Sequence, residues 1–184
     1  MAALRLRQYD PRDCDAVWQL HERAMRAAGT DPSDIPGTDD LRTIGSTYLD
    51  GGGDFLVGVC EDELALEAGT ASPPETFDGT LVAMGGFLPS EAGHDDERTV
   101  AGAAELHRMR VAPDFQGRGY GRQLLGALER RAAAAGFEVA LATTARRQKR
   151  AQEFYTAAGY RAVDRSTFGE YELVHFEKRL RNQD

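Results

Sequence analysis

Apolar residues along the chain follow two spacings, and Gly or Pro separates most of the segments. Apolar positions that recur every three or four residues predict amphipathic helices, whereas short apolar runs predict buried strands. We expect helices over residues 11–28, 39–49, 118–135 and 148–158, and strands over residues 4–6, 55–59, 81–87, 103–111, 139–143, 160–167 and 171–180. The order β-α-α-β-β-β-α-β-α-β-β indicates a mixed α+β fold.

Two acidic segments, residues 61–79 and 91–97, interrupt this order. Both contain Gly or Pro, which favour turns, so we expect exposed loops there, with a short helical turn over residues 63–68. The chain of 184 residues is long enough for one well-cored domain and short for two. Residues 1–184 are therefore predicted to form a single domain.

The fourth predicted strand has an irregular apolar pattern. Its apolar residues change from even-numbered positions, Ala104 and Leu106, to odd-numbered positions, Met109 and Val111. Side chains alternate between the two faces of a strand, so a regular strand cannot place both pairs on one face. One extra residue near His107-Arg108, a β-bulge, would restore a common apolar face. A strand with two exposed faces would explain the pattern without a bulge.

The turn after this strand is the most informative segment. Pro113 cannot donate to a strand ladder, so the strand is expected to end near Val111. Gly117, Gly119 and Gly121 lack a Cβ atom, which lets an anion approach their backbone N–H groups closely. The amphipathic helix that follows has free N–H groups in its first turn and the positive end of its dipole at the same place. The segment therefore predicts a pyrophosphate-binding turn.

Two common phosphate-binding motifs fit this segment less well. A P-loop needs a Lys-Ser or Lys-Thr pair, and the sequence contains neither. A dinucleotide fingerprint would need its third glycine one residue after Gly121. The segment Gln116-Gly117-Arg118-Gly119-Tyr120-Gly121 instead resembles the Q/R-x-x-G-x-G/A signature of the GNAT superfamily, the acyl-CoA-dependent N-acyltransferases. Together with Val111-Ala112-Pro113 before it and Phe154-Tyr155 after it, residues 105–160 look like the GNAT core.

The resemblance implies a GNAT-like, mixed and mostly antiparallel central sheet of about seven strands, flanked by about four helices. It also implies acetyl-CoA as co-substrate and no metal. Free backbone groups of the bulged strand would bind the pantetheine arm, and the glycine turn would bind the pyrophosphate. The family often has Asn where this chain has Gln148. The expected cofactor-binding residues are Met109, Arg110, Val111, Gln116, Gly117, Arg118, Gly119, Tyr120, Gly121, Arg122 and Gln148.

Amide formation from a thioester needs a base for the amine and an acid for the departing thiolate. The resemblance places Glu105 where some GNAT enzymes have a glutamate base, with a solvated glutamate and ordered water as the alternative. His107 could relay a proton or be a structural histidine. Tyr155 stands where the family commonly has an acid beside the CoA sulfur. It also shares a helical face with Phe154 and its neighbours, so a packed core tyrosine is the alternative.

The charge balance bears on partners. The net charge of −8 disfavours nucleic acid and anionic membranes and would favour a cationic acceptor such as an amine, although it would equally serve solubility. A basic cluster is expected at the cofactor entrance, about half of it merely solvated: Arg118, Arg122, Arg146, Arg147, Lys149 and Arg150. Four aspartates occur near the segments expected to shape the acceptor site: Asp31, Asp34, Asp39 and Asp40.

The remaining chemistry-bearing residues indicate neither a metal site nor export. Cys14 and Cys60 lack metal-ligand spacing and are expected to be buried, reduced thiols, and His21, His94 and His175 show no such spacing either. The sequence has no secretory signal pattern and no apolar run of 18 residues, which predicts a cytoplasmic enzyme. We predict an N-acetyltransferase acting on a small-molecule or peptide amine, with no nucleic-acid or membrane partner and a homodimer left open. A non-catalytic acyl-CoA-binding domain is the main alternative, and the glycine spacing disfavours a Rossmann-type nucleotide binder.

Overall fold

The computed structural model describes residues 4–34, 37–61 and 73–181. Its centre is an eight-stranded sheet with the order β1-β2-β4-β5-β6-β8-β7, and β3 pairs with β4 beside this path. Neighbouring strands are antiparallel except for β5 and β6, which are parallel. The strands are β1 (Leu4–Gln8), β2 (Asp54–Cys60), β3 (Glu75–Thr76), β4 (Gly79–Pro89), β5 (Ala103–Val111), β6 (Val139–Ala145), β7 (Arg161–Phe168) and β8 (Tyr171–Arg179).

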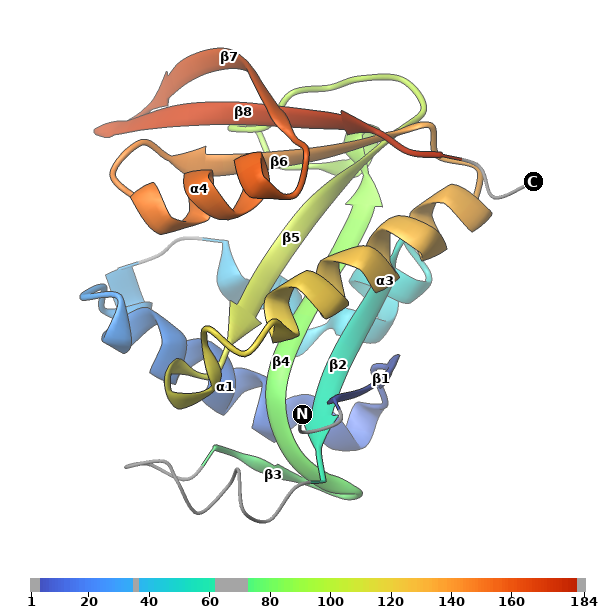
Figure 1. Ribbon diagram of the computed structural model, residues 1–184, viewed down its shortest axis with the longest axis vertical. Coiled ribbons are helices and arrows are strands. Elements are labelled where there is room, and N and C mark those ends of the chain that lie inside the picture. Colours follow the sequence, from blue (N-terminus) through green and yellow to red (C-terminus); the bar gives the residue numbers. More distant parts are fainter. Residues whose placement is uncertain (1–3, 35–36, 62–72, 182–184) are drawn as a thin grey trace.

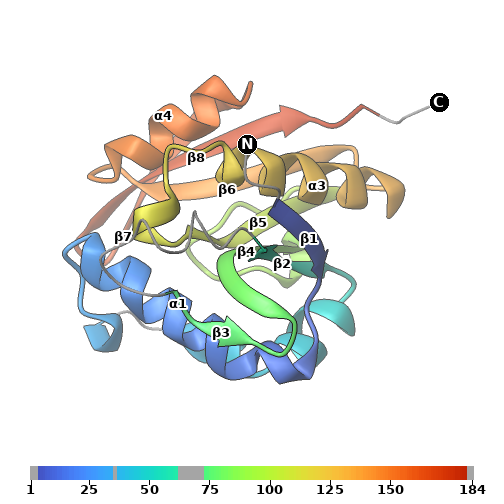
Figure 2. The same ribbon diagram turned by 60° about the horizontal axis from the view of Figure 1, so that its bottom comes forward.

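Helices cover both faces of the sheet, with α1 on one face and α3 and α4 on the other (Figure 2). The α-helices are α1 (Cys14–Ala27), α3 (Tyr120–Ala134) and α4 (Lys149–Ala157). Short helical segments connect them: η1 (Pro11–Asp13), η2 (Pro32–Asp34), η3 (Thr38–Arg42), η4 (Gly45–Leu49), η5 (Ser90–Ala92) and η6 (Pro113–Phe115). The predicted α+β architecture is therefore confirmed.

Two clusters of buried side chains join these layers. On the α1 side, Leu20 packs in one cluster with Tyr48 and Phe55. On the α3 side, Leu124 and Leu128 pack in a second cluster with residues of β2, β4 and β5. Burial of such side chains is the main stabilising contribution in a sheet sandwiched between helices. The central strands are thus held from both sides, and they form a rigid support for side chains at their ends.

The bulge predicted in β5 is present. The β4–β5 register shifts between Met84 and Gly86, where β5 accommodates an extra residue. Arg108 lies in this bulge with a φ of 56°, a left-handed conformation that non-glycine residues rarely adopt. As a result, Leu106 before the bulge and Met109 within it both pack on the α3 side. The interruption of the alternating pattern in the sequence therefore has the predicted structural cause.

Strands β5 and β6 separate after a short paired stretch. Their pairing runs only from Ala103 with Val139 to Glu105 with Leu141, although both strands continue. Figure 1 shows the two strands diverging, with α4 beside the gap between them. Beyond Glu105, the edge of β5 that faces β6 has no β6 ladder partner. The sheet is thereby opened near the start of α3.

The structure differs from the prediction in two connecting regions. The helix expected over residues 39–49 is divided into a 3-10 helix, η3, and a single π turn, η4. Thr43 lies between them and bonds back to Asp39 O, and Gly45 follows, so the local sequence favours an interruption over a continuous helix. The short strand β3 occurs where only a loop was expected. The helical turn expected over residues 63–68 lies outside the described residues.

The two cysteines are free, as expected for reduced thiols, but only Cys60 is fully buried, whereas Cys14 is half-buried. Among the described residues, no helix combines the length and the apolarity that crossing a bilayer would require.

Candidate active site

Glu105 occupies the point at which β5 and β6 separate. Its side chain is almost completely enclosed, with 1% of the residue exposed, and its Oε1 has no hydrogen-bond partner within the described part of the chain. Burial, and after it the negative charge of Glu97, raises the pKa of Glu105 to about 8. A carboxyl group with a pKa this close to neutrality can take up and release a proton during turnover.

Tyr155 reaches the same interior region from α4. The residue is 7% exposed, and its ring packs against the rings of Phe154, Tyr160 and Phe176. Burial, and after it the charge of Glu105, raises the pKa of the Tyr155 hydroxyl, while a nearby arginine, Arg110, acts in the opposite direction. Tyr155 therefore packs as a core tyrosine and also keeps its proton near neutral pH, as an acid must.

The glycine turn is shaped as an anion cradle. Gly117 and Gly119 have left-handed φ values of 76° and 82°, and a Cβ atom added to either would meet no atom within 4 Å. Helix α3 begins immediately after Gly119, so its unbonded first-turn N–H groups lie at the turn. Tyr120 is buried and stacked on Phe115, so only its backbone can serve a ligand there. The residues present fit a phosphate group.

Side chains fasten this turn to the neighbouring elements. Gln116 Nε2 donates to Val111 O at 3.4 Å, and its Oε1 accepts a bond from Arg150 Nη1, also at 3.4 Å. Arg122 Nη1 donates to Ala157 O at 2.9 Å. The turn is therefore connected both to the end of β5 and to α4. The structure brings these predicted residues together around the opening between β5 and β6.

Other members of the predicted basic cluster have different partners. The Arg118 guanidinium lies over the Phe115 ring, 4.6 Å from its centroid. Arg146 pairs with Glu172 of β8 at 2.7 Å, and Arg147 lies over the ring of Tyr171. Arg146 is thus engaged in an ion pair at the β7–β8 hairpin, which makes it a poorer candidate for phosphate binding than the arginines at the turn.

Gln148 immediately precedes α4, and its side chain is turned back into the loop. Its Oε1 accepts a hydrogen bond from Ala145 N at 3.2 Å, which closes the connection between β6 and α4. The expected contact between Gln148 and pantetheine stays a prediction. That contact would require the amide group to use its free N–H donors or to leave Ala145.

The described aspartates near the expected acceptor site do not form a free anionic pocket for a cationic acceptor. Asp40 accepts a hydrogen bond from the Tyr48 hydroxyl at 2.5 Å and pairs with Arg108 at 3.0 Å, so its charge is already compensated. Asp31 bonds to the backbone and hydroxyl of Ser33 within its own turn. Asp39 is exposed, and the side chain of Asp34 lies outside the described part. The positive partner of Asp40 comes from the β5 bulge, which sequence spacing alone does not reveal.

Glu97 was missed by the sequence analysis, which assigned residues 91–97 to an exposed loop. Its side chain is only 8% exposed, and its Oε1 lies 2.6 Å from His107 Nε2. Burial acts to raise the pKa of Glu97, but the hydrogen bonds with His107 and with the His94 N–H hold that pKa below its usual value. His107 is therefore a hydrogen-bonded interior histidine. Polar groups of His94, Glu97 and His107 gather within 4.8 Å, and the hydrogen bonds among them account for this proximity without a metal.

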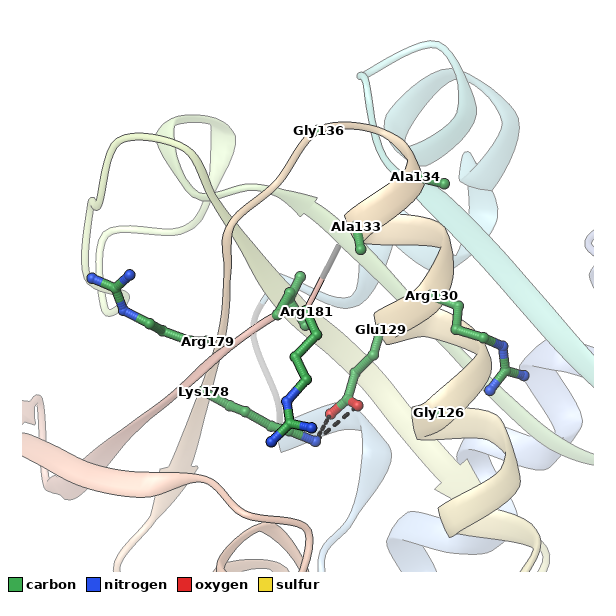
Figure 3. Close-up of a pocket in the computed structure, with 10 residues that line it drawn as sticks. Gly126, Glu129, Arg130, Ala133, Ala134, Gly136, Lys178, Arg179 and Arg181 are labelled. Atoms are coloured by element: carbon green, nitrogen blue, oxygen red, sulfur yellow. Dashed lines mark hydrogen bonds and ion pairs between the residues drawn. The ribbon is translucent and has the colours of Figure 1, made fainter. Parts of the chain in front are cut away.

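A hollow of about 720 Å³ lies elsewhere, between the C-terminal half of α3 and the end of β8 (Figure 3). Glu129 accepts bonds there from Lys178 Nζ and from the Tyr160 hydroxyl, each at 2.9 Å. Figure 3 shows Arg130 and Arg179 pointing away from each other on opposite sides of this hollow. The Glu129 contacts join α3 to β8, and this region includes neither Glu105 nor Tyr155.

Comparison with known proteins agrees with this geometry. The model of the Acetyltransferase (GNAT) family matches residues 54–160, which contain Glu105, the glycine turn and Tyr155. The chain belongs to the GNAT acetyltransferase family. The resemblance seen in the sequence is thus confirmed, and the mostly antiparallel sheet excludes the Rossmann alternative.

Solved structures share the fold over nearly the whole chain. A GNAT-family acetyltransferase from Staphylococcus aureus has a TM-score of 0.72 at 16% identity, covering 97% of this chain and 100% of its own. The yncA protein of Salmonella typhimurium, solved with its cofactor acetyl-CoA, has a TM-score of 0.66 at 20% identity, covering 98% and 96%. The Escherichia coli ribosomal-protein-S18-alanine N-acetyltransferase has a TM-score of 0.64 at 16% identity, covering 97% and 94%. No curated protein matches the sequence.

Proposed function

We propose that this protein transfers the acetyl group of acetyl-CoA to a primary amine by direct attack of the amine on the thioester. The observation that carries the proposal is the pairing of two buried, electrostatically coupled groups, Glu105 and Tyr155, beside the gap between β5 and β6. Membership of the GNAT family supports acyl transfer as the reaction class. The acetyl-CoA in the Salmonella structure of the same fold supports the choice of donor.

The donor would be held by the turn and by the open edge of β5. N–H groups from Gly117 to Arg122 would bind the pyrophosphate, with Arg118 and Arg150 nearby to compensate its charge. Free backbone groups of Met109, Arg110 and Val111 would bind the pantetheine arm. This arrangement would bring the thioester toward the region between Glu105 and Tyr155.

The two buried groups would divide the proton transfers. Glu105 accepts a proton from the acceptor ammonium, which leaves a neutral nitrogen that can form a bond to the thioester carbonyl carbon. As the carbon–sulfur bond breaks, Tyr155 donates its hydroxyl proton to the thiolate sulfur. After attack the nitrogen still carries one extra proton, which it loses as the amide forms; of this proton and the one held by Glu105, one returns Tyr155 to its neutral form and the other leaves to solvent. The products are an acetylated amine and free CoA thiol, with one proton released overall.

A non-catalytic acyl-CoA-binding domain is the alternative from a different functional class. Such a domain would need the glycine turn but would not need a buried carboxyl group with a raised pKa opposite a buried tyrosine. The presence of both groups favours the enzyme. We further propose a cytoplasmic location and a small-molecule or peptide acceptor, with no nucleic-acid or membrane partner; a homodimer stays a prediction.

The test is a panel of primary amines incubated with the protein and acetyl-CoA. Free CoA thiol and acetylated amine are both measured, because equal amounts of the two distinguish transfer from thioester hydrolysis. We expect amine-dependent release of CoA that saturates with the acceptor. If acetyl-CoA raises the melting temperature but no amine releases CoA, the non-catalytic alternative holds.

A further inference from the structure

Arg110 directs its side chain away from α3 and toward the α1 side of the sheet. It pairs with Met84 across the β4–β5 ladder, and Met84 packs in the cluster beneath α1. Residues directly opposite in an antiparallel ladder place their side chains on the same face. Arg110 Nη1 donates to the carbonyl of its neighbour Met109 at 2.9 Å, whereas its Nε is buried without a hydrogen-bond partner.

No carboxylate of the described residues forms an ion pair with Arg110. Arg108, two residues earlier, is the contrast, because it forms two contacts with Asp40, at 3.0 Å each. Arg110 is half-buried as a residue, but its guanidinium Nε is withdrawn from water, and withdrawing a charged group without an anionic partner costs free energy. The Asp40 charge is already compensated by Arg108. The positive charge of Arg110 therefore has no ion-pair partner among the described residues, although the protein has a net charge of −8.

The neighbouring groups reflect this excess charge. Burial, and after it the charges of Arg110 and Arg108, lowers the pKa of His21 on α1 to about 4, so His21 is neutral at physiological pH. Both ring nitrogens of His21 are buried without partners among the described residues. Burial, and then Arg108, lowers the pKa of Arg110 to about 10, which still leaves it charged. The interior between α1 and β5 is thus a favourable environment for an anion.

Glu105 faces the same side of the sheet as Arg110, because it pairs with Leu88, which packs in the same α1-side cluster as Met84. Tyr155 interacts electrostatically with both groups: the charge of Glu105 raises the pKa of its hydroxyl, and the charge of Arg110 lowers it. A proton-accepting carboxyl and a guanidinium with an unused Nε donor therefore face the same side of the sheet, and both are close enough to Tyr155 to act on it electrostatically. A ligand carrying both an ammonium and a carboxylate matches both groups, whereas a polyamine would place a second positive charge near Arg110.

We propose that the acceptor is a free amino acid whose carboxylate accepts hydrogen bonds from Arg110 while its amine faces Glu105. This proposal rests on the amine acetylation proposed above and specifies the acceptor of that same site. Arg110 is then a specificity-determining residue of the acceptor site through its side chain, in addition to the backbone role that the family resemblance assigns to it.

The test compares each amino acid with its own carboxamide. Glycine, β-alanine, γ-aminobutyrate and the common L-amino acids serve as acids, and their primary amides serve as partners of equal size without the negative charge. The amide has the less basic amine, so intrinsic reactivity at neutral pH favours the amide over the acid. We expect the wild type to prefer the best acid over its amide by roughly 10- to 100-fold in kcat/KM, the range for a charge-assisted hydrogen bond.

Variants assign that preference to Arg110. Arg110→Gln should abolish the preference, mainly by raising KM for the acid, and Arg110→Lys should restore part of it. Both should keep the rise in melting temperature with acetyl-CoA, because the side chain faces away from the glycine turn. Arg165→Gln, a change of an exposed arginine on β7, is the control and should keep the preference.

The outcomes separate this proposal from the proposed function. Equal rates for acids and amides in the wild type, or a preference that persists in Arg110→Gln, would overturn the assignment while acetyl transfer stands. Loss of the acetyl-CoA response in Arg110→Gln would also overturn it. If no amine is acetylated, the acetylation mechanism fails, and the same amino acids are then tested as ligands. A rise in melting temperature that requires Arg110 would still support the anion site, and its absence would overturn that site as well.

Discussion

Replacing Glu105 by Gln should stabilise the protein at alkaline pH, although Glu105 is a fully buried polar residue. The substitution keeps nearly the same volume and removes only the ionisable group. In the folded protein the pKa of Glu105 is about 8, against an ordinary value of 4.5. The folded state therefore holds this proton more tightly than the unfolded state does. The contribution of Glu105 to the free energy of unfolding therefore falls as pH rises from 4.5 to 8, and this loss is nearly complete above pH 8.

The magnitude follows from the two pKa values. The full difference corresponds to about 5 kcal/mol, of which about 4 kcal/mol should develop between pH 5 and pH 9. Domains of this kind have a total stability of roughly 5–15 kcal/mol, so the effect is large enough to measure. Glu105→Gln has no such dependence at this position. Its advantage over the wild type should therefore grow with pH and become constant above pH 8.

The assay is urea unfolding of the wild type and Glu105→Gln at several pH values from 5 to 9, at constant ionic strength. Glu153→Gln on the exposed face of α4 is the control, and its difference from the wild type should not change with pH. A stability difference between Glu105→Gln and the wild type that stays constant over this range would refute the raised pKa, and with it the electrostatic description of the site.

Three further results are expected. Gly119→Val should weaken the rise in melting temperature with acetyl-CoA. Gly136→Val is the control, because Gly136 is also a left-handed glycine but follows the other end of α3, and it should keep that rise. An unchanged rise in Gly119→Val would remove the turn from the cofactor site. Tyr155→Phe should lower kcat by about 10²–10⁴-fold with acetyl-CoA affinity retained, while Tyr160→Phe, which loses a hydrogen bond to α3, should stay within a few-fold of the wild-type rate. Glu97→Gln removes a negative charge that raises the pKa of the base, so the ascending limb of kcat/KM should move to lower pH; an unmoved limb would count against that coupling.

Local patterns in the sequence were sufficient where one segment determines its own geometry. The parity change between Leu106 and Met109 predicted the β5 bulge, because side-chain alternation is a property of the strand alone. The glycines from residue 117 onward predicted the turn before α3 in the same way. Strand β5 was predicted with its observed bounds, and the helix after it within two residues.

Partnerships between distant segments could not be predicted. Glu97 is buried because His107 lies across from it, and Asp40 is compensated because the bulge presents Arg108 to η3. Each pair joins residues of different elements, so no regular spacing along the sequence indicates that they meet. The unpaired charge of Arg110 could not be predicted either, because it depends on Asp40 pairing with Arg108. The roles of Glu105 and Tyr155 were taken from the family resemblance, and they stay predictions until turnover is measured.

The most direct test of the proposed acetylation is kcat/KM as a function of pH for the wild type and Glu105→Gln with the best acceptor. The wild type should show an ascending limb near pH 8, because Glu105 must be unprotonated to accept the ammonium proton. The variant should be slow near neutrality and recover as pH approaches the pKa of the amine, where solvent supplies the neutral nucleophile. A rate that falls equally at every pH would give Glu105 an orienting role in place of a base, and an unaffected profile would contradict its place in the active site.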